Sequence, residues 1–139
     1  VLPYIVRWIS RGATLTGAEV FTGFSQMAAL RDAALGAIRG FDFLLSPVAP
    51  VARFPAEWAS PINDPERPFE HIAFTLPFNM SEQPAISVDC GRTPEGAPIG
   101  LQIAGRRHDD LGVLRLARAW ERLREPPPPW PRPPAAPTR

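Results

Sequence analysis

The chain has 139 residues and a formal net charge of +1, and 45% of its residues are hydrophobic. This length is typical of one domain. The near-neutral charge predicts neither a nucleic-acid nor a membrane partner, because both attract clustered basic residues. One cysteine excludes an internal disulfide and indicates a reducing compartment. With no apolar run of the ~18 residues that a membrane span needs, and no signal-peptide pattern, we expect a cytoplasmic protein.

Two helices are predicted in the first forty residues. Residues 3–11 are largely apolar and end at Gly12. Thr16 and Glu19 form a capping-box pattern, in which a hydroxyl and a carboxylate each satisfy a free backbone N–H. The second helix is expected to run from Thr16 to Arg39. Apolar residues at spacings of three, four and seven predict one buried stripe along it: Phe24, Met27, Ala28, Leu35 and Ile38.

A buried strand and a surface excursion follow. Residues 42–47, DFLLSP, are a short continuous apolar run between turn residues, which is typical of a central strand buried on both faces. Five prolines interrupt residues 48–70. A proline-punctuated stretch with a few large apolar anchors predicts a long excursion over the surface.

Two strands joined by a hairpin are predicted next. Residues 85–88 are an apolar run that follows Gln83-Pro84, and several glycines and prolines then mark a turn. In residues 98–104, Ile99, Leu101 and Ile103 alternate with other residues and so share one face of a strand.

The last predicted element is a helix over residues 109–124, capped by the Asp109 carboxylate. Eight prolines lie in the twelve residues 126–137. Residues 126–139 are therefore expected to be a polyproline II or disordered tail that adds nothing to the core. Residues 1–125 are expected to form the folded portion.

The stretch from Phe74 to Gly105 combines turn and strand signals in a specific order. It reads FTLPFNMSEQPAISVDCGRTPEGAPIGLQIAG. It resembles the C-terminal signature region of the amidase signature family, which reads roughly T-x-P-x-N-x-x-G-x-P-A-x-S-x-P…G-x-P-I-G-x-Q. The resemblance implies an α/β fold class, present here as a partial amidase-signature fold. Residues 42–46, 85–88 and 98–104 are then strands of one mixed β-sheet, with residues 16–39 and 109–124 as covering helices.

The resemblance also implies hydrolysis of a small-molecule amide by a Ser, a second Ser on a cis peptide and a Lys base. This chain has no lysine, since all fifteen of its basic residues are arginine, and none of its six serines lies between glycines. Arginine stays charged and cannot act as the base. We therefore assign no catalytic residue and expect a C-terminal portion of an amidase that is inactive alone. No cofactor or metal is predicted, because two histidines and one cysteine fall short of a zinc set.

Three polar residues match the family pattern near its catalytic centre: Thr75, Asn79 and Gln102. The resemblance implies that they lie in the shell around the nucleophile loop, which is not in this chain, and hold its backbone groups. The alternative is that Asn79 satisfies only its own turn. Among the departures from the pattern, Glu82 stands where the family has Gly, and Asp89 where it has Pro. A positive φ at Glu82 costs on the order of 1–2 kcal/mol.

Two further interpretations of the whole chain stay open. One is a fragment of the A subunit of a tRNA-dependent amidotransferase. The resemblance implies an Asp three residues before the Thr of the motif in that subunit, to pair the amino group of glutamine, but Ile72 occupies this place. The other is a non-enzymatic remnant or binding module. A partial sheet also leaves edges unpaired, so self-association through uncovered sheet surfaces is expected.

Other chemical signals have simpler explanations. A thiol–imidazole pair of Cys90 with His71 or His108 lacks a legible orienting group. The basic run at residues 106–108, with Arg92, is more typical of a solvated turn than of an anion site. Residues 127–133 have the proline content of an SH3 or WW ligand, but equally that of a chain end leaving a domain.

Overall fold

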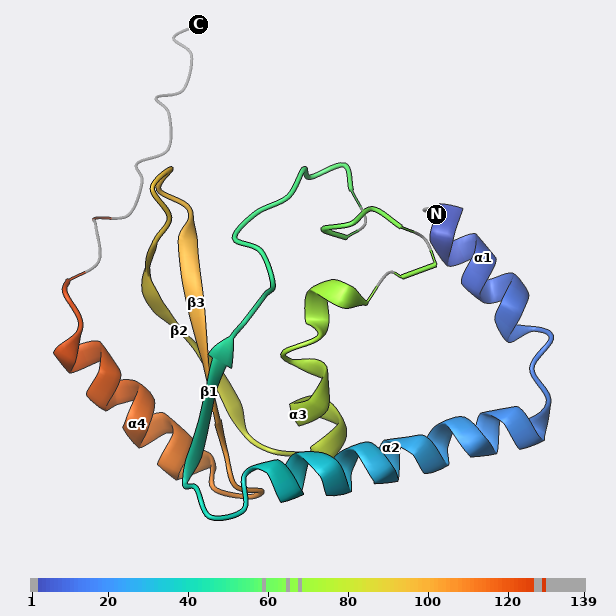
Figure 1. Ribbon diagram of the computed structural model, residues 1–139, viewed down its shortest axis with the longest axis horizontal. Coiled ribbons are helices and arrows are strands. Elements are labelled where there is room, and N and C mark those ends of the chain that lie inside the picture. Colours follow the sequence, from blue (N-terminus) through green and yellow to red (C-terminus); the bar gives the residue numbers. More distant parts are fainter. Residues whose placement is uncertain (1–2, 59, 65, 68, 127–128, 130–139) are drawn as a thin grey trace, which may run out of the picture.

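The computed structural model describes residues 3–58, 60–64, 66–67, 69–126 and 129. In chain order the elements are α1 (Pro3–Gly12), α2 (Gly17–Ala37), β1 (Phe43–Pro47), a 3-10 turn (Glu70–Ile72), α3 (Leu76–Ser81), β2 (Ala85–Arg92), β3 (Pro98–Gly105) and α4 (Asp110–Leu123). Figure 1 shows the sheet between α4 and α3, with α2 running along one end of the molecule.

The three predicted strands form one sheet, as expected, in the order β1-β3-β2. Both pairings are antiparallel, so the described strands are an antiparallel part of the expected α/β fold. The prediction that residues 42–47 form a central strand buried on both faces is wrong. β1 is an edge strand of the described sheet, and Leu45 is 58% exposed. The reason is that α4 packs mainly against β2 and β3, so Phe43 of β1 contacts the core while Leu45, on the same face, stays exposed.

The core lies between β3 and α4, where Ile103 is 1% exposed. It packs with Val88 and Ala117. Half-buried apolar residues surround this centre: Phe43, Ile86, Leu101, Leu116 and Trp120. The predicted shared face of residues 98–104 is thus confirmed for Leu101 and Ile103, which pack in the core, whereas Ile99 on the same face is exposed. Helix α4 begins as predicted, because the Asp109 carboxylate accepts the Gly112 N–H at 3.0 Å.

Helix α2 has the predicted capping box. The Thr16 N–H donates to the Glu19 carboxylate at 2.8 Å, and the Glu19 N–H donates to the Thr16 hydroxyl at 3.3 Å. The bonds from the backbone and then the side chain of Thr16 hold the pKa of Glu19 below its usual range. The buried stripe, however, is only partly correct: Ile38 is 4% exposed, but Phe24 is 67% exposed. Figure 1 shows the first turns of α2 extending beyond the sheet and α3.

Helix α1 and the excursion from residue 48 also follow the prediction. No helix or strand occurs in the described residues between β1 and the 3-10 turn. The excursion contacts α1 through a Trp8–Phe69 ring stack, with centroids 5.0 Å apart, and an exposed Arg7–Glu66 ion pair. The predicted proline-rich tail, including the alternative peptide ligand at residues 127–133, lies outside the described residues except at Pro126 and Pro129.

Helix α3 ends at Glu82 in the left-handed conformation, with a φ of 58°. The strain expected where the family has glycine is therefore present. The carboxylate of Glu82 pairs with Arg31 of α2, at 2.5 Å, and with Arg107 after β3. This single side chain ties the end of α3 to two other elements.

Two variants of Glu82 distinguish the energetic cost of the backbone strain from the contribution of the ion pairs. Both Glu82→Gly and Glu82→Ala lose the ion pairs, but only alanine keeps the left-handed strain. We expect the glycine variant to be more stable by about 1 kcal/mol. Urea unfolding followed by circular dichroism measures the difference. Equal free energies of unfolding for the two variants would show that the backbone is unstrained there.

Candidate functional site

A buried amide lies at the centre of the candidate site. Gln102, in the middle of β3, is 4% exposed and faces away from the core residue Ile103. Its Nε2 donates to the Ser46 hydroxyl and to the Phe74 carbonyl, both at 2.9 Å. Ser46 is directly opposite Gln102 in the register of β1 and β3. One side chain therefore joins two strands to the segment that opens α3.

Thr75, the next residue after Phe74, is half-buried at the start of α3. Its hydroxyl donates to the Ile72 carbonyl at 3.2 Å. The Thr75 carbonyl accepts the N–H groups of Phe78 and Asn79, at 3.2 and 3.4 Å. Thr75 and Gln102 thus fix the same short turn, one from within it and the other from the sheet.

Asn79 lies one turn further along α3 and is exposed. Among the described residues no hydrogen bond involves its side chain, so the alternative in which Asn79 satisfies its own turn has no support in the geometry. The three predicted residues lie on one segment and its anchoring strand. Their contacts differ: Gln102 and Thr75 bond within the chain, while Asn79 is exposed and has no side-chain hydrogen bond to another described residue.

A second buried network, which no sequence pattern indicated, holds the far end of α3. The Ser81 hydroxyl donates to the Gln83 side-chain oxygen at 2.9 Å, and the Gln83 amide donates to the Gly105 carbonyl at 2.8 Å. Ser81 is 0% and Gln83 6% exposed. Gln83-Pro84 was recognisable in the sequence as a turn signal. The hydrogen-bond partner of the Gln83 side chain was not, because Gly105 lies 22 residues away. Helix α3 is therefore anchored to β3 at both of its ends.

An apolar pocket of about 240 Å³ lies between α2, β1 and α3. Ser46 is the one polar side chain among its described lining residues, which are Ala34, Ala37, Leu44, Ser46, Ala73, Phe74, Pro77 and Phe78. Its hydroxyl already accepts from Gln102. The pocket therefore suits an apolar group and offers no nucleophile–base pair.

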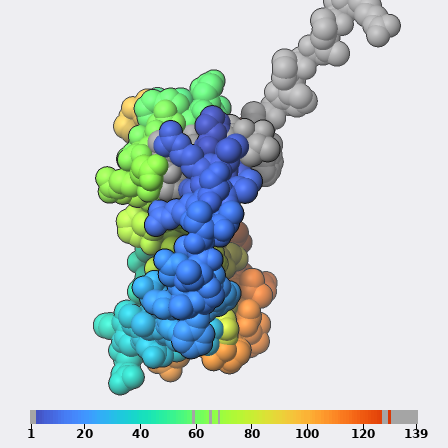
Figure 2. All heavy atoms as spheres, turned by 90° about the vertical axis from the view of Figure 1, so that its right-hand side faces the viewer, coloured from blue at the N-terminus to red at the C-terminus, as the bar shows by residue number. Residues whose placement is uncertain are grey.

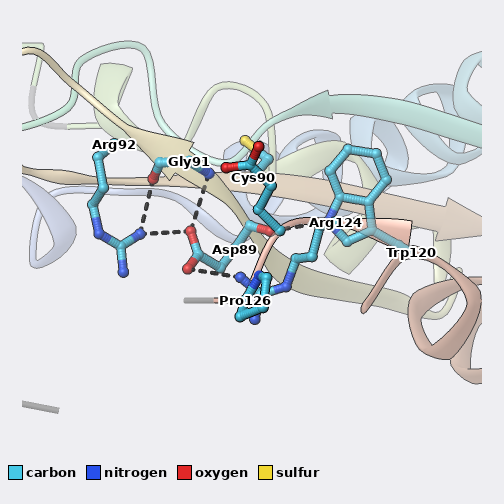
Figure 3. Close-up of a pocket in the computed structure, with 8 residues that line it drawn as sticks. Asp89, Cys90, Gly91, Arg92, Trp120, Arg124 and Pro126 are labelled. Atoms are coloured by element: carbon cyan, nitrogen blue, oxygen red, sulfur yellow. Dashed lines mark hydrogen bonds and ion pairs between the residues drawn. The ribbon is translucent and has the colours of Figure 1, made fainter. Parts of the chain in front are cut away.

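A separate cluster surrounds Asp89 at the bulge of β2, shown in Figure 3. Its carboxylate pairs with Arg92 at 2.6 Å and with Arg124 at 3.0 Å. The Asp89 carbonyl accepts the indole N–H of Trp120 at 2.9 Å. These contacts fasten the end of α4 to the hairpin, beside a pocket of about 440 Å³. Both guanidinium groups already pair with the Asp89 carboxylate, so we interpret the cluster as a structural contact and not as an anion site.

The Asp89 fastening has a predictable pH dependence. The Arg92 side chain, followed by the Gly91 N–H, holds the pKa of Asp89 below its usual range. The unfolded chain therefore binds the proton first as the pH falls, so the contribution is complete above the unfolded pKa of about 3.9 and is lost below it. We expect Asp89→Asn to lower Tm at pH 7, and this Tm difference to shrink as the pH falls below about 4.

The control for this prediction is Asp32→Asn, because Asp32 is exposed and makes no ion pair with another described residue. Differential scanning fluorimetry between pH 3 and pH 7 measures both variants against the unchanged chain. A Tm difference for Asp89→Asn that stays constant over this range would contradict a contribution from the ionised carboxylate.

The alternative sites are not assembled in the described part of the chain. The Cys90 thiol is exposed and lies 3.4 Å from the Ile99 carbonyl, with no hydrogen bond to a described histidine. Arg106 pairs with Asp42, and Arg107 with Glu82, so both guanidinium groups already have partners. No cluster of metal-ligating side chains occurs among the described residues. None of the described helices is long and apolar enough to cross a membrane.

The described residues form part of an α/β fold in which a buried glutamine on the sheet holds the turn at the start of α3. The family model of the amidases matches residues 1–114. The chain belongs to the amidase family.

Individual relatives agree with this assignment. The chain is 44% identical over 86 residues to the A subunit of the glutamyl-tRNA(Gln) amidotransferase of Myxococcus xanthus strain DK1622, covering 62% of this chain and 17% of that protein. It is 33% identical over 132 residues to an acylamidase of Rhodococcus erythropolis, covering 91% of this chain and 27% of the relative. A crystal structure of an amidase matches with a TM-score of 0.75 and 27% identity, over 88% of this chain and 29% of that one. The chain therefore spans between about a sixth and a quarter of these curated relatives.

Proposed function

We propose that this chain forms part of an enzyme that hydrolyses the C–N bond of a small-molecule amide in the cytoplasm. The observation that carries the proposal is the pair of hydrogen bonds from Gln102 to Ser46 and Phe74, in a segment that matches the amidase family. The nucleophilic Ser, the Ser on a cis peptide and the Lys base belong to residues outside this sequence, which contains no lysine.

In this proposal the chain positions the start of α3 and, through it, the nucleophile loop. It supplies no base that accepts the proton of the nucleophile. Gln102 fixes the Phe74 carbonyl, and Thr75 fixes the turn after it, so α3 starts from a rigid point. Asn79, one turn later, then holds backbone groups of the nucleophile loop through its exposed amide. The loop makes and hydrolyses the acyl-enzyme, and its geometry depends on how firmly this shell supports it.

A chimera tests this role. The matched residues of the Rhodococcus erythropolis acylamidase are replaced by the matching section of this chain, and hydrolysis of the parent enzyme's amide is measured. We expect activity in the chimera, and a fall in kcat of about 10²-fold for its Asn79→Ala variant, because a misplaced catalytic loop costs about that much. The control is Gln26→Ala, an exposed amide on α2. A folded but inactive chimera would contradict the proposal, and an unchanged kcat for Asn79→Ala would remove Asn79 from the shell.

A second candidate is the A subunit of a tRNA-dependent amidotransferase, which releases ammonia from glutamine. The 44% identity to such a protein favours it. Against it stands Ile72, which is half-buried and apolar where an ammonium partner is needed. A chimera built in the same way on the amidotransferase distinguishes the two: glutaminase activity that matches the parent's would favour the amidotransferase.

The third candidate is a non-enzymatic remnant or binding module. For the isolated chain we propose self-association through its uncovered sheet surfaces, because β1 has an unpaired edge in the described sheet and Leu45 beside it is exposed. Light scattering during size-exclusion chromatography measures this. A monomer with a cooperative melt would mean that the chain is a self-sufficient module.

A further inference from the structure

Glu82 occupies a position that is locally unfavourable for a glutamate in two ways. It ends α3 with a φ of 58°, where a side chain is strained and the family pattern has glycine. Its carboxylate also lies at the C-terminal end of the helix, the negative end of the helix dipole, where a basic residue is preferred. Local structure therefore does not account for a glutamate here, and the contacts that Glu82 makes with other elements are the relevant ones.

The Glu82 carboxylate pairs with Arg31 of α2 at 2.5 Å and with Arg107 after β3. In Figure 2 the cyan end of α2 lies beside orange spheres of the chain after β3, and these are the two segments that the carboxylate joins to α3. Exposed ion pairs contribute little by themselves. The Arg31 Nε, however, is buried and has no hydrogen-bond partner among the described residues. A guanidinium that is partly withdrawn from water depends on its counter-ion, because the loss of that partner leaves an uncompensated charge.

Packing alone leaves α3 room to shift against α2. The apolar pocket of about 240 Å³ lies between these helices, where Ala34 and Ala37 of α2 and Pro77 and Phe78 of α3 line it. Small side chains beside a pocket make few of the close contacts that fix one helix against another. The ion pairs of Glu82 therefore supply a restraint that the apolar contact does not.

From these contacts we propose that Glu82 is a positioning residue, whose ion pairs hold the end of α3 and so set the place of Asn79, three residues earlier. This rests on the proposed function, in which Asn79 supports the nucleophile loop. Because α3 has only six residues, release of its end also displaces Asn79. A displacement of about 1 Å near the reacting groups costs about 10²-fold in rate.

Hydrogen exchange in the 139-residue chain tests the restraint itself. Glu82→Gln removes the charge but keeps the side-chain length and the left-handed residue. We expect exchange at the N–H groups of Phe78 and Asn79, which donate to the Thr75 carbonyl, to become about fivefold faster. The matched control is Glu95→Gln, because Glu95 is exposed and makes no ion pair with another described residue; it should leave this exchange unchanged. Equal exchange rates in Glu82→Gln and the unchanged chain would overturn the proposal.

The acylamidase chimera described above tests the consequence for the reaction. We expect Glu82→Gln to lower kcat about tenfold and to change KM by less than about twofold, because the nucleophile loop is misplaced while substrate binding is retained. Adding Arg31→Gln to Glu82→Gln should lower kcat no further, since residues in one ion-pair network are coupled. Glu95→Gln again serves as the control.

Each outcome of the chimera experiment supports or contradicts a specific step. An unchanged kcat for Glu82→Gln in an active chimera overturns the positioning role. So does a fall in activity that equals the loss of folded chimera, or a further fall when Arg31→Gln is added. A folded but inactive chimera contradicts the proposed function, and the exchange measurement on the chain then still decides whether Glu82 holds α3.

Discussion

Replacing Ile103 by alanine is expected to lower the free energy of unfolding by about 2–5 kcal/mol. Ile103 is 1% exposed and is the largest fully buried apolar side chain in the described chain. Removing its outer carbons leaves a cavity between β3 and α4 that the surrounding strands cannot close. Because few other apolar residues are fully buried, a loss of this size approaches the whole stability of a marginal fold.

The control for Ile103 lies on the same face of the same strand. Ile99 is 39% exposed, so Ile99→Ala is expected to cost less than about 1 kcal/mol. Urea unfolding followed by circular dichroism compares the two variants with the unchanged chain. Similar losses for both positions would mean that α4 does not form the core described here.

Replacing Gln102 by leucine is expected to cost about 2–4 kcal/mol. Leucine has a similar volume but donates no hydrogen bond, so the Phe74 carbonyl and the Ser46 hydroxyl both lose the Nε2 donor that they share. A buried polar group without its partner keeps the full cost of desolvation. The effect should therefore exceed the value of the hydrogen bonds alone.

The same denaturation experiment tests Gln102→Leu, with Gln26→Leu on the exposed surface of α2 as control. The control is expected to change the free energy of unfolding by no more than about 0.5 kcal/mol. If Gln102→Leu changes the free energy of unfolding no more than the control does, the Gln102 amide does not hold the α3 segment. The proposed support of the nucleophile loop by Gln102 would then be wrong.

The elements were predictable from sequence because their signals are local. The Thr16–Glu19 capping box and the Asp109 cap define helix starts through residues three positions apart. The alternation of Leu101 and Ile103 likewise needs only the period of a strand.

Burial was less predictable, because it depends on elements that the local pattern does not specify. The DFLLSP run has the composition of a central strand, but its place at the edge of the described sheet follows from which strands pair with it. The stripe of α2 has the correct period, yet Phe24 is exposed because the helix extends beyond its neighbours. In both cases the sequence pattern describes a buried environment that the described residues do not supply.

The sequence predicted the residues of the candidate site but not their distant partners. Thr75, Asn79 and Gln102 matched a family pattern, so their positions could be singled out. The partners of Gln102 could not, since Ser46 is 56 residues away and the Phe74 carbonyl has no side-chain signal. Asp89 was noticed as a departure from the family, but its pairing with Arg124 joins a strand to a distant helix.

We propose that this chain supplies supporting residues of an amidase but no nucleophile–base unit. The measurement that tests it most directly is the rate of benzamide or acetamide hydrolysis by the purified 139-residue chain. We predict a rate at background, because removing a whole nucleophile–base unit forfeits on the order of 10⁶ in rate. Robust turnover that survives Cys90→Ala would contradict the claim, because the chain would then contain a catalytic site of its own.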